Sequence, residues 1–148
     1  MNIYRALAEL EERNGNGALC TIVRSQGSTP RRTGSKMLVY PDGSFIGTVG
    51  GGEMESRVMA EALSVIHDGK ARMLEYSLSE PERGDPGVCG GRVEIFVEPV
   101  HPRPLLLVVG GGHVGQAVAH LARWLGYRVA VSDDRPEFCT PEAVPEAE

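Results

Sequence analysis

The chain has 148 residues, of which 41% are hydrophobic, so it can bury one ordinary core or two small ones. A net charge of −5 and an aromatic content of 5% exclude the usual nucleic-acid-binding surfaces, which are basic and rich in stacking rings. No apolar run approaches the roughly 18 residues of a membrane span. The amphipathic, acidic N-terminus is not a signal peptide, and the three cysteines are too widely spaced for a disulfide framework. These features predict a cytoplasmic protein that binds neither nucleic acid nor membrane.

The first hundred residues predict an α+β domain over residues 1–101. Apolar residues at helical spacing predict a helix over 3–13, and a second helix that opens after the glycines at 50–52 and ends at 67–69. Short β-rich runs predict strands over 18–25, 36–40, 45–49, 71–78 and 92–97. Turn residues at 41–44 predict a hairpin between the second and third strands. Pro99, Pro102 and Pro104 then mark a linker.

Residues 104–148 predict a partial Rossmann-like β-α-β unit, which makes the whole chain α/β. Five apolar residues at 105–109 are typical of a parallel strand buried on both faces. The following helix ends at Gly126, and a second strand is expected over 128–132. The expected core face of this helix consists of Val114, Val118, Leu121 and Leu125. The tail, residues 136–148, is expected to be frayed or truncated.

The segment between this strand and this helix fits the dinucleotide fingerprint. Gly110 would permit the tight turn, Gly112 would admit a pyrophosphate to the helix N-terminus, and Gly115 would allow the helix to pack closely on the strand. Asp133 ends the next strand, where an acidic residue accepts hydrogen bonds from a ribose. Because only half of a dinucleotide fold is present, a Rossmann-shaped scaffold with an empty crevice is the alternative.

Two loops of the first domain offer groups that bind anions. Ser28, Thr29, Arg31 and Lys36 bring hydroxyl, guanidinium and ammonium donors into a short stretch. A solvated basic loop is the alternative interpretation. These residues are candidate cofactor contacts.

The second loop contains Gly50, Gly51 and Gly52 at the start of a helix, where backbone N–H groups form anion sites. Glu53 and Glu55 in the first turn would repel an anion and satisfy the helix end themselves. An acid–base or metal-side role of Glu53 is the alternative to that structural role.

The cysteines differ in their surroundings. Cys89 stands before Gly90 and Gly91 in a loop, so its thiol is expected to be exposed and able to bind a soft metal or carry sulfur. Cys20 lies in an apolar strand and is expected to be a buried small hydrophobe. Cys139 in the tail is expected to be incidental.

Taken together, the motifs resemble the XdhC/CoxI family of xanthine dehydrogenase accessory factors. They are Gly-Ser-Thr-Pro-Arg at 27–31, Lys-Met-Leu-Val at 36–39, Gly-Thr-Val-Gly-Gly-Gly-x-x-Glu at 47–55, Cys-Gly-Gly-Arg-Val at 89–93 and Val-Gly-Gly-Gly-His-Val at 109–114. Each motif is weak alone, but five in this order are specific. The resemblance runs from about residue 3 to residue 138.

The resemblance implies a chaperone for the molybdenum cofactor rather than a classical metabolic enzyme. Members are thought to bind this pterin cofactor, assist its sulfuration and insert it into a molybdenum hydroxylase such as xanthine dehydrogenase. Ser28, Thr29, Arg31 and the glycines at 50–52 then become phosphate and pterin contacts, and Cys89 becomes the sulfur-handling or molybdenum-facing residue, with Gly90 beside it. The apo-enzyme, a cysteine desulfurase and a second copy of the chain are the expected partners.

Two departures from the family pattern limit this transfer. Position 53 is Glu where many relatives resemble Gly-Gly-Gly-Cys or Gly-Gly-Gly-His, and relatives continue well past residue 148.

Two rival functions stay open, an NAD(P)-binding oxidoreductase and a protein-interaction scaffold that binds no small molecule.

Overall fold

The computed structural model describes residues 2–77 and 91–148, which form two compact units, Met1–Pro102 and Arg103–Glu148. We refer to them as unit 1 and unit 2 and describe each by itself. In the described part of the chain, no helix is both long and apolar enough to cross a membrane.

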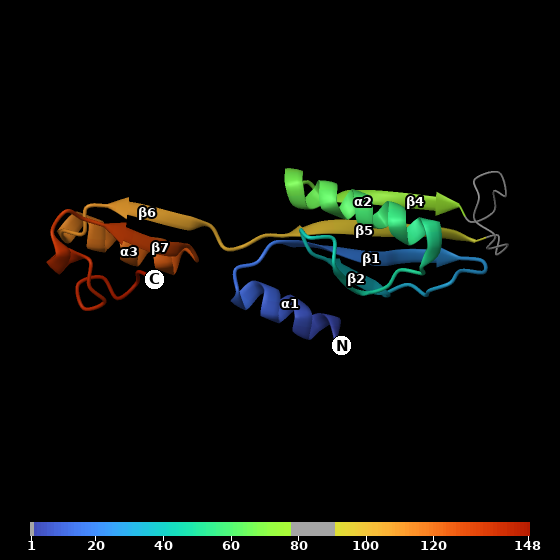
Figure 1. The fold of residues 1–148 in the computed structure, drawn as a ribbon, viewed down its shortest axis with the longest axis horizontal. Helices are drawn as coiled ribbons and strands as arrows, with labels where there is room; N and C mark the ends of the chain where they lie inside the picture. The colour runs from blue at the N-terminus through green and yellow to red at the C-terminus, as the bar shows by residue number, and fades with distance from the viewer. Residues whose placement is uncertain (1, 78–90) are drawn as a thin grey trace. The chain divides into compact units, whose positions relative to one another are not determined.

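Unit 1 is an antiparallel sheet of five strands in the order β3-β2-β1-β5-β4 with two helices (Figure 1). The strands are β1 (Gly17–Gln26), β2 (Lys36–Val39), β3 (Phe45–Gly47), β4 (Arg72–Ser77) and β5 (Arg92–Val100). The helices are α1 (Ile3–Glu12) and α2 (Gly52–Asp68). All the predicted elements of the first domain are present, and β2 and β3 form the predicted hairpin.

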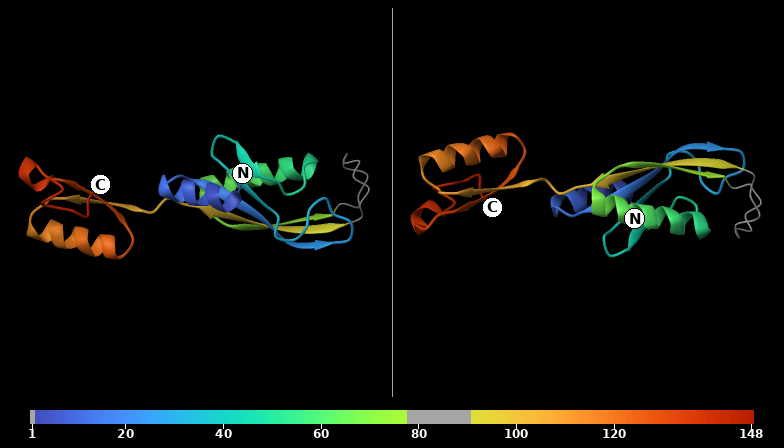
Figure 2. Two further views of the ribbon diagram at one scale, coloured as in Figure 1. Left: turned by 90° about the horizontal axis from the view of Figure 1, so that it is seen from below. Right: turned by 90° about the horizontal axis from the view of Figure 1, so that it is seen from above.

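The main core of unit 1 lies between α2 and the central strands. Met54, Val58, Ala62 and Val65 recur on one face of α2 and are buried against β1 and β5. Figure 2 shows α2 on one side of these strands. The helix ends at Gly69, whose left-handed conformation is the usual way to stop a helix. The burial of the four apolar residues named above confirms the apolar face predicted for α2.

A smaller core lies under α1. Ala6 and Leu10 of α1 pack against Leu38, whose side chain alternates with those of Met37 and Val39 along β2. Because successive strand residues point to opposite faces, α1 and α2 cover different faces of β2.

The fifth strand is longer than the sequence predicts. Pro99 belongs to β5 and lies opposite Ala18 of β1, although its ring was expected to mark a linker. The pairing between β4 and β5 ends with Arg72 opposite Val97, so Pro99 lies beyond the end of β4. At Pro99 the strand β5 is therefore flanked by β1 alone, an edge position in which a strand tolerates proline.

Unit 2 is a parallel β-α-β unit, as predicted. Strand β6 (Leu105–Val109) pairs in parallel with β7 (Arg128–Ser132), and α3 (His113–Trp124) connects them. A short 3-10 turn, η2 (Pro136–Phe138), follows β7. Figure 2 shows α3 on one side of the two strands.

The predicted core face of α3 is wrong. Val114, Val118 and Leu121 are exposed, and the buried positions of the helix are Gly115, Ala119 and Ala122. The small residues allow the helix axis to approach the strands closely, so the large apolar residues are left on the outer side of the helix.

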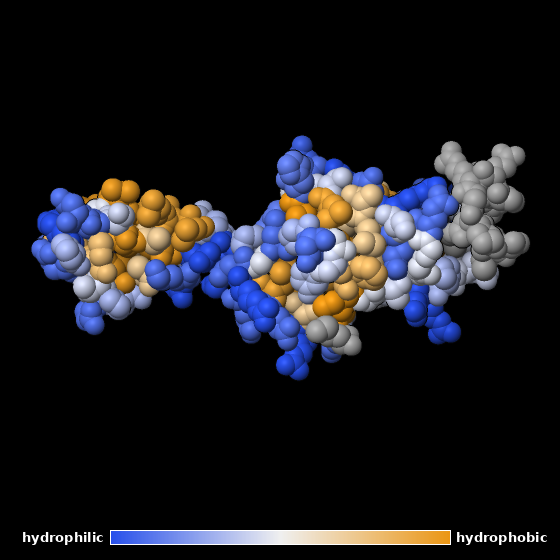
Figure 3. Space-filling view, in the orientation of Figure 1, coloured by the Kyte–Doolittle hydropathy of each residue, from blue (hydrophilic) through white to orange (hydrophobic). Residues whose placement is uncertain are grey.

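The expectation that β6 is buried on both faces is also wrong for unit 2 as described. Val108 is buried, but Leu105, Leu107 and Val109 are more than half exposed. Apolar side chains therefore gather on the surface of this unit (Figure 3).

The tail is packed rather than frayed. Val144 is 1% exposed and joins the core formed by Val108, Ala119 and Val129. The backbone N–H of Glu148 donates to the carbonyl oxygen of Val129 at 2.9 Å. The tail was expected to be irregular because it contains few hydrophobic residues, but one of them, Val144, is buried in the core of unit 2.

Candidate functional site

Three sequence motifs of unit 1 meet where β1 ends and β5 begins. Gln26 of β1 lies opposite Arg92 of β5, which brings the residues 27–31 (the serine–arginine loop) beside Gly91. Gly91 is buried, and a β-carbon there would come within 2.4 Å of the Ser28 carbonyl oxygen. Only glycine fits this contact.

The glycine turn, residues 50–52, joins the same assembly. Gly50 has φ +145°, and a β-carbon there would lie 2.8 Å from the Pro30 ring and 2.9 Å from Met54. Pro30 therefore packs against Gly50. The structure brings together the serine–arginine loop, the glycine turn and the start of β5, which the sequence could only place separately.

Hydroxyl groups hold the serine–arginine loop in shape. The Thr29 hydroxyl donates to the carbonyl oxygen of Arg31 at 2.9 Å and lies 2.6 Å from the Ser25 hydroxyl. Ser28 and Arg31 are exposed. Thr29 thus shapes the loop, whereas Ser28 and Arg31 present their side chains to solvent.

The remaining cations near this loop differ in their partners. Lys36 on β2 donates to the Thr21 hydroxyl at 2.9 Å. Arg31 and Arg32 are exposed and form no ion pair with any described residue. Two neighbouring guanidinium groups with no ion pair among the described residues favour contact with phosphate or carboxylate.

Glu55 holds the glycine turn. Its Oε2 atom accepts hydrogen bonds from the Thr48 hydroxyl, from the Val49 N–H at 3.1 Å and from the Gly51 N–H at 3.2 Å. Glu53 instead pairs with Arg57 one turn along α2. The sequence suggested that first-turn carboxylates satisfy the helix end, and the structure assigns this role to Glu55.

Glu55 was not among the site residues predicted from sequence. Its place in the first turn of α2 predicted only a helix-end role, in which the carboxylate reaches back to the N-terminal N–H groups, as in a capping box.

The three cysteines stand in different positions. Cys89 and Gly90 lie outside the described residues, so their predicted roles stay predictions. Cys20 is fully buried on β1, and desolvation raises the pKa of its thiol to about 12, which makes it inert at neutral pH. The expectation of a buried, unreactive Cys20 is confirmed. No group of three metal-ligating side chains occurs among residues 2–77 and 91–148.

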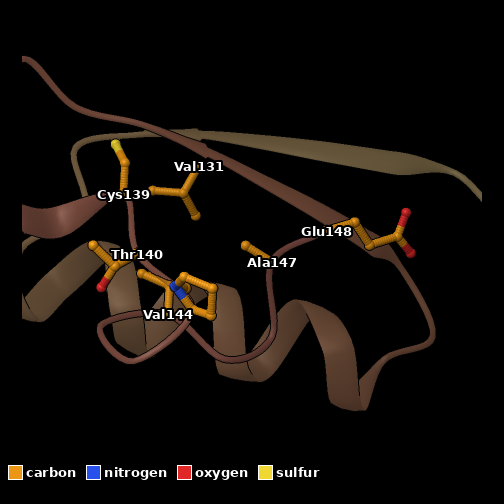
Figure 4. Close-up of a pocket in the computed structure, with 7 residues that line it drawn as sticks. Val131, Cys139, Thr140, Val144, Ala147 and Glu148 are labelled. Atoms are coloured by element: carbon orange, nitrogen blue, oxygen red, sulfur yellow. The ribbon is translucent and has the colours of Figure 1, made fainter. Parts of the chain in front are cut away.

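Cys139 lines a small cavity in unit 2 (Figure 4). Its volume is about 120 Å³, and Val131, Val144 and Ala147 form its apolar part. Sites for cofactor-sized ligands are typically about 300 Å³ or larger. This cavity is therefore too small for a pterin or a dinucleotide.

The Gly-rich loop of unit 2 has the geometry that the fingerprint predicts for its glycines. Gly110 has φ +103°, and a β-carbon on Gly115 would lie 1.7 Å from the Gly110 carbonyl oxygen. Gly111 is covered by this chain itself, because a β-carbon there would lie 2.5 Å from the Phe138 carbonyl oxygen.

Asp133 makes its contacts within unit 2. Its carboxylate accepts from the Gly111 N–H at 2.8 Å and from the Arg135 backbone N–H, Nε and Nη2 at 2.9, 2.9 and 3.1 Å. The side chain is 2% exposed, and the Arg135 guanidinium stacks on the Phe138 ring at 4.1 Å. In the structure the Asp133 carboxylate accepts from these donors of the chain itself. The ribose contact predicted for Asp133 stays a prediction.

These contacts make the stability of unit 2 depend on pH in the acid range. Hydrogen bonds from the Arg135 side chain, then from the backbone N–H groups of Arg135 and Gly111, hold the pKa of Asp133 far below its usual value. A lowered folded-state pKa stabilises the folded form above the unfolded pKa of about 3.9, and this contribution is lost as the pH falls toward the folded value.

We therefore expect Asp133→Asn to lower the urea midpoint of unit 2 by a constant amount above about pH 5, and by a decreasing amount below about pH 4. The single tryptophan, Trp124, lies on α3 and reports this unit in fluorescence-monitored unfolding. Parallel pH profiles of the two proteins down to the acid limit would contradict this role of Asp133.

Comparison with known proteins relates both units to one family. The profile of the XdhC and CoxI family matches residues 10–77, and the profile of the XdhC Rossmann domain matches residues 106–148. YqeB of Escherichia coli is 40% identical over 98% of the chain, and PaoD of Escherichia coli, a molybdenum cofactor insertion chaperone, is 33% identical over 65%. A probable xanthine dehydrogenase subunit from Bacillus subtilis is 35% identical over 36% of the chain.

The chain spans about a third or less of these curated relatives, namely 27%, 31% and 16% of their lengths. A crystal structure described as a xanthine dehydrogenase from Bacillus halodurans is similar to this chain with a TM-score of 0.60. The match covers 100% of this chain and 67% of the chain in the crystal. At 19% identity this likeness is one of fold. With both profiles matched in order along one polypeptide, the chain belongs to the XdhC and CoxI family.

Proposed function

We propose that this protein is an accessory factor that binds the molybdenum cofactor and assists its sulfuration and insertion into a molybdenum hydroxylase such as xanthine dehydrogenase. The observation that carries the proposal is the meeting of the serine–arginine loop, the glycine turn and Gly91 at one place in unit 1. Family membership and the similarity to PaoD support it.

The residues present fit a phosphorylated pterin. The cofactor would supply a phosphate, a hydrogen-bonding pterin and a sulfur-bound metal. Ser28 and Arg31 present exposed donors that suit the phosphate, and Thr29 holds their loop in shape. Lys36 could add a charge, since its ammonium has donors beyond the one given to Thr21. Gly91 leaves no side chain between the serine–arginine loop and β5, and the residues 50–52 offer a backbone surface without side chains.

Cys89 is the proposed sulfur-handling or molybdenum-facing thiol, with Gly90 and Gly91 following it in the sequence. A cysteine desulfurase is the proposed sulfur donor, and the hydroxylase apo-enzyme is the proposed acceptor of the cofactor. We place this role in the cytoplasm, because the three widely spaced cysteines do not predict the disulfide framework of a secreted protein.

The proposal is tested by the binding of purified molybdenum cofactor in anaerobic ultrafiltration with elemental analysis. We expect the wild-type chain to retain molybdenum, Cys89→Ser to lose it, and the control Cys139→Ser to retain it. The thiol of Cys139 lies in the other unit, in a cavity too small for the cofactor. Equal retention by both variants would remove Cys89 from the mechanism, and no retention by the wild type would refute cofactor binding.

We further propose that the protein is a homodimer that associates through unit 2. The supporting feature is the apolar surface of β6, where Leu107 is 60% and Val109 is 82% exposed. Leu107→Lys is expected to shift the protein from dimer to monomer in sedimentation velocity, because burial of a lysine in an apolar interface is costly. His120→Lys on the polar side of α3 is the control. A monomeric wild type would contradict this proposal.

Dinucleotide binding by unit 2 is a second candidate function, favoured by the tight turn at Gly110 and the close packing of Gly115. An increase in NADH fluorescence on addition of the protein would support it. Unchanged NADH and NADPH fluorescence would leave the Gly-rich loop with a structural role.

A further inference from the structure

Three hydrogen-bond donors at the glycine turn and in the two residues before it converge on one atom of the chain itself. The Thr48 hydroxyl, the Val49 N–H and the Gly51 N–H converge on Oε2 of Glu55, and the Gly50 N–H donates to the Thr48 hydroxyl at 3.1 Å. Successive backbone N–H groups around a concave turn are the arrangement that binds phosphate in other proteins. Here a carboxylate takes the place that the phosphate oxygen would occupy.

This occupancy has two consequences for an anionic ligand. The Val49 and Gly51 N–H groups are already satisfied, so a phosphate would have to displace Glu55 to reach them. The carboxylate also repels a phosphate placed nearby, since like charges disfavour each other at short range.

The adjoining loop has the opposite character. Arg31 and Arg32 are exposed and form no ion pair within the described chain, and Ser28 beside them is exposed as well. Pro30 packs on Gly50, so the basic loop and the closed glycine turn are neighbours. The two neighbouring loops therefore differ in the charge and in the free donors that they offer to an anion.

We infer that Glu55 closes the glycine turn to anions and thereby directs the phosphate of the ligand to the Ser28–Arg32 side of the site. The inference deepens the proposed function and rests on it for the identity of the natural ligand. It assigns the phosphate-binding role to one of the two predicted loops and gives the other a role in shaping the site. The class of ligand recognised is a phosphate monoester.

The test is a titration with inorganic phosphate, followed by backbone amide chemical shifts in the full chain. In the wild type, the amides of residues 28–34 are expected to respond while those of Val49 and Gly51 do not. Changing Arg31 and Arg32 together to alanine is expected to weaken phosphate binding by about tenfold or more, since charge-assisted contacts dominate such sites.

Two variants of Glu55 separate its charge from its hydrogen bonding. Glu55→Ala leaves three donors without an acceptor, so phosphate is expected to shift the Val49 and Gly51 amides. Glu55→Gln is the matched control, because its uncharged amide oxygen can still accept from the Val49 and Gly51 N–H groups, so these amides are expected to stay unresponsive. Unchanged amide shifts of β1 and β5 verify the fold of each variant.

Three outcomes would overturn the inference: a response of the Val49 and Gly51 amides in the wild type, no response in residues 28–34, or an unresponsive glycine turn in a folded Glu55→Ala protein. If Glu55→Ala does not fold, the wild-type and Glu55→Gln titrations decide the matter. Molybdenum retention without the phosphate response of residues 28–34 refutes this inference alone. The phosphate response without molybdenum retention refutes the proposed function alone.

Discussion

Replacing Gly115 with alanine is expected to unfold unit 2 and leave unit 1 folded. The added β-carbon would lie 1.7 Å from the Gly110 carbonyl oxygen, and 2.9 Å from the Gly110 carbonyl carbon. Both atoms are backbone, so no side-chain rotation relieves the clash, and α3 must separate from β6. Overpacking of this kind costs about 3 kcal/mol or more when the backbone has to move.

Unit 2 cannot absorb this loss. A unit of its size is stabilised by only a few kcal/mol, at roughly 0.1 kcal/mol per residue. Its core is small, with Val108, Ala119, Ala122, Val129 and Val144 as its buried apolar side chains. A loss of about 3 kcal/mol therefore removes most of its stability.

Gly112→Ala is the matched control in the same loop. Gly112 has φ −69°, and the nearest atom to its added β-carbon is Nη2 of Arg135 at 4.0 Å. Amide hydrogen exchange resolves the two units separately. We expect loss of protection in α3 and β7 for Gly115→Ala, and near-native protection for Gly112→Ala. Native protection of both variants would show that the close contact at Gly115 can relax.

Gly91→Ala is expected to abolish retention of the molybdenum cofactor while unit 1 stays folded. The new β-carbon would lie 2.4 Å from the Ser28 carbonyl oxygen, 2.7 Å from Cγ2 of Thr29 and 2.8 Å from the Gln26 carbonyl oxygen. These three atoms belong to Gln26, Ser28 and Thr29, none of which is among the buried residues of the main core under α2. The serine–arginine loop would therefore move away from β5 without unfolding the sheet.

Retention is measured by the ultrafiltration assay, with thermal unfolding as the test of fold. Arg92→Ala, one residue further along β5, is the control. Its exposed ion pair with Glu75 is worth about 0–1 kcal/mol at most, so it should retain the cofactor. We expect the amount of retained molybdenum to fall about tenfold or more for Gly91→Ala, by loss of the site's positioned donors. Wild-type retention by Gly91→Ala would separate the serine–arginine loop from cofactor binding.

Local sequence patterns determined the elements of both units. Alternation and helical spacing placed the five strands and α2 of unit 1, because a core-facing stripe must repeat with the period of its element. The strand, Gly-rich loop, helix and second strand in succession predicted the parallel pairing of β6 with β7. The motif order along the chain also determined the family, which both profiles confirm.

Tertiary packing decided what local patterns could not. The apolar stripe of α3 that includes Leu121 looked like a core face, yet Ala119 and Ala122 are buried because they let the helix approach the strands. Pro99 entered β5 because β4 ends before it, a fact about pairing that no local pattern contains. Val144 anchored a tail that its composition alone describes as irregular.

The candidate site shows the same division. The sequence by itself determined which residue types stand in the 27–31 and 50–55 motifs, since each motif is a local string. Only the tertiary structure shows why positions 91 and 50 require glycine: Ser28 and Pro30 lie against them and leave no room for a side chain. It also decided that Glu55 rather than Glu53 closes the glycine turn and that Asp133 is held by Arg135. The physical reason is that hydrogen bonds and close contacts depend on distances in space, whereas a sequence records only distances along the chain.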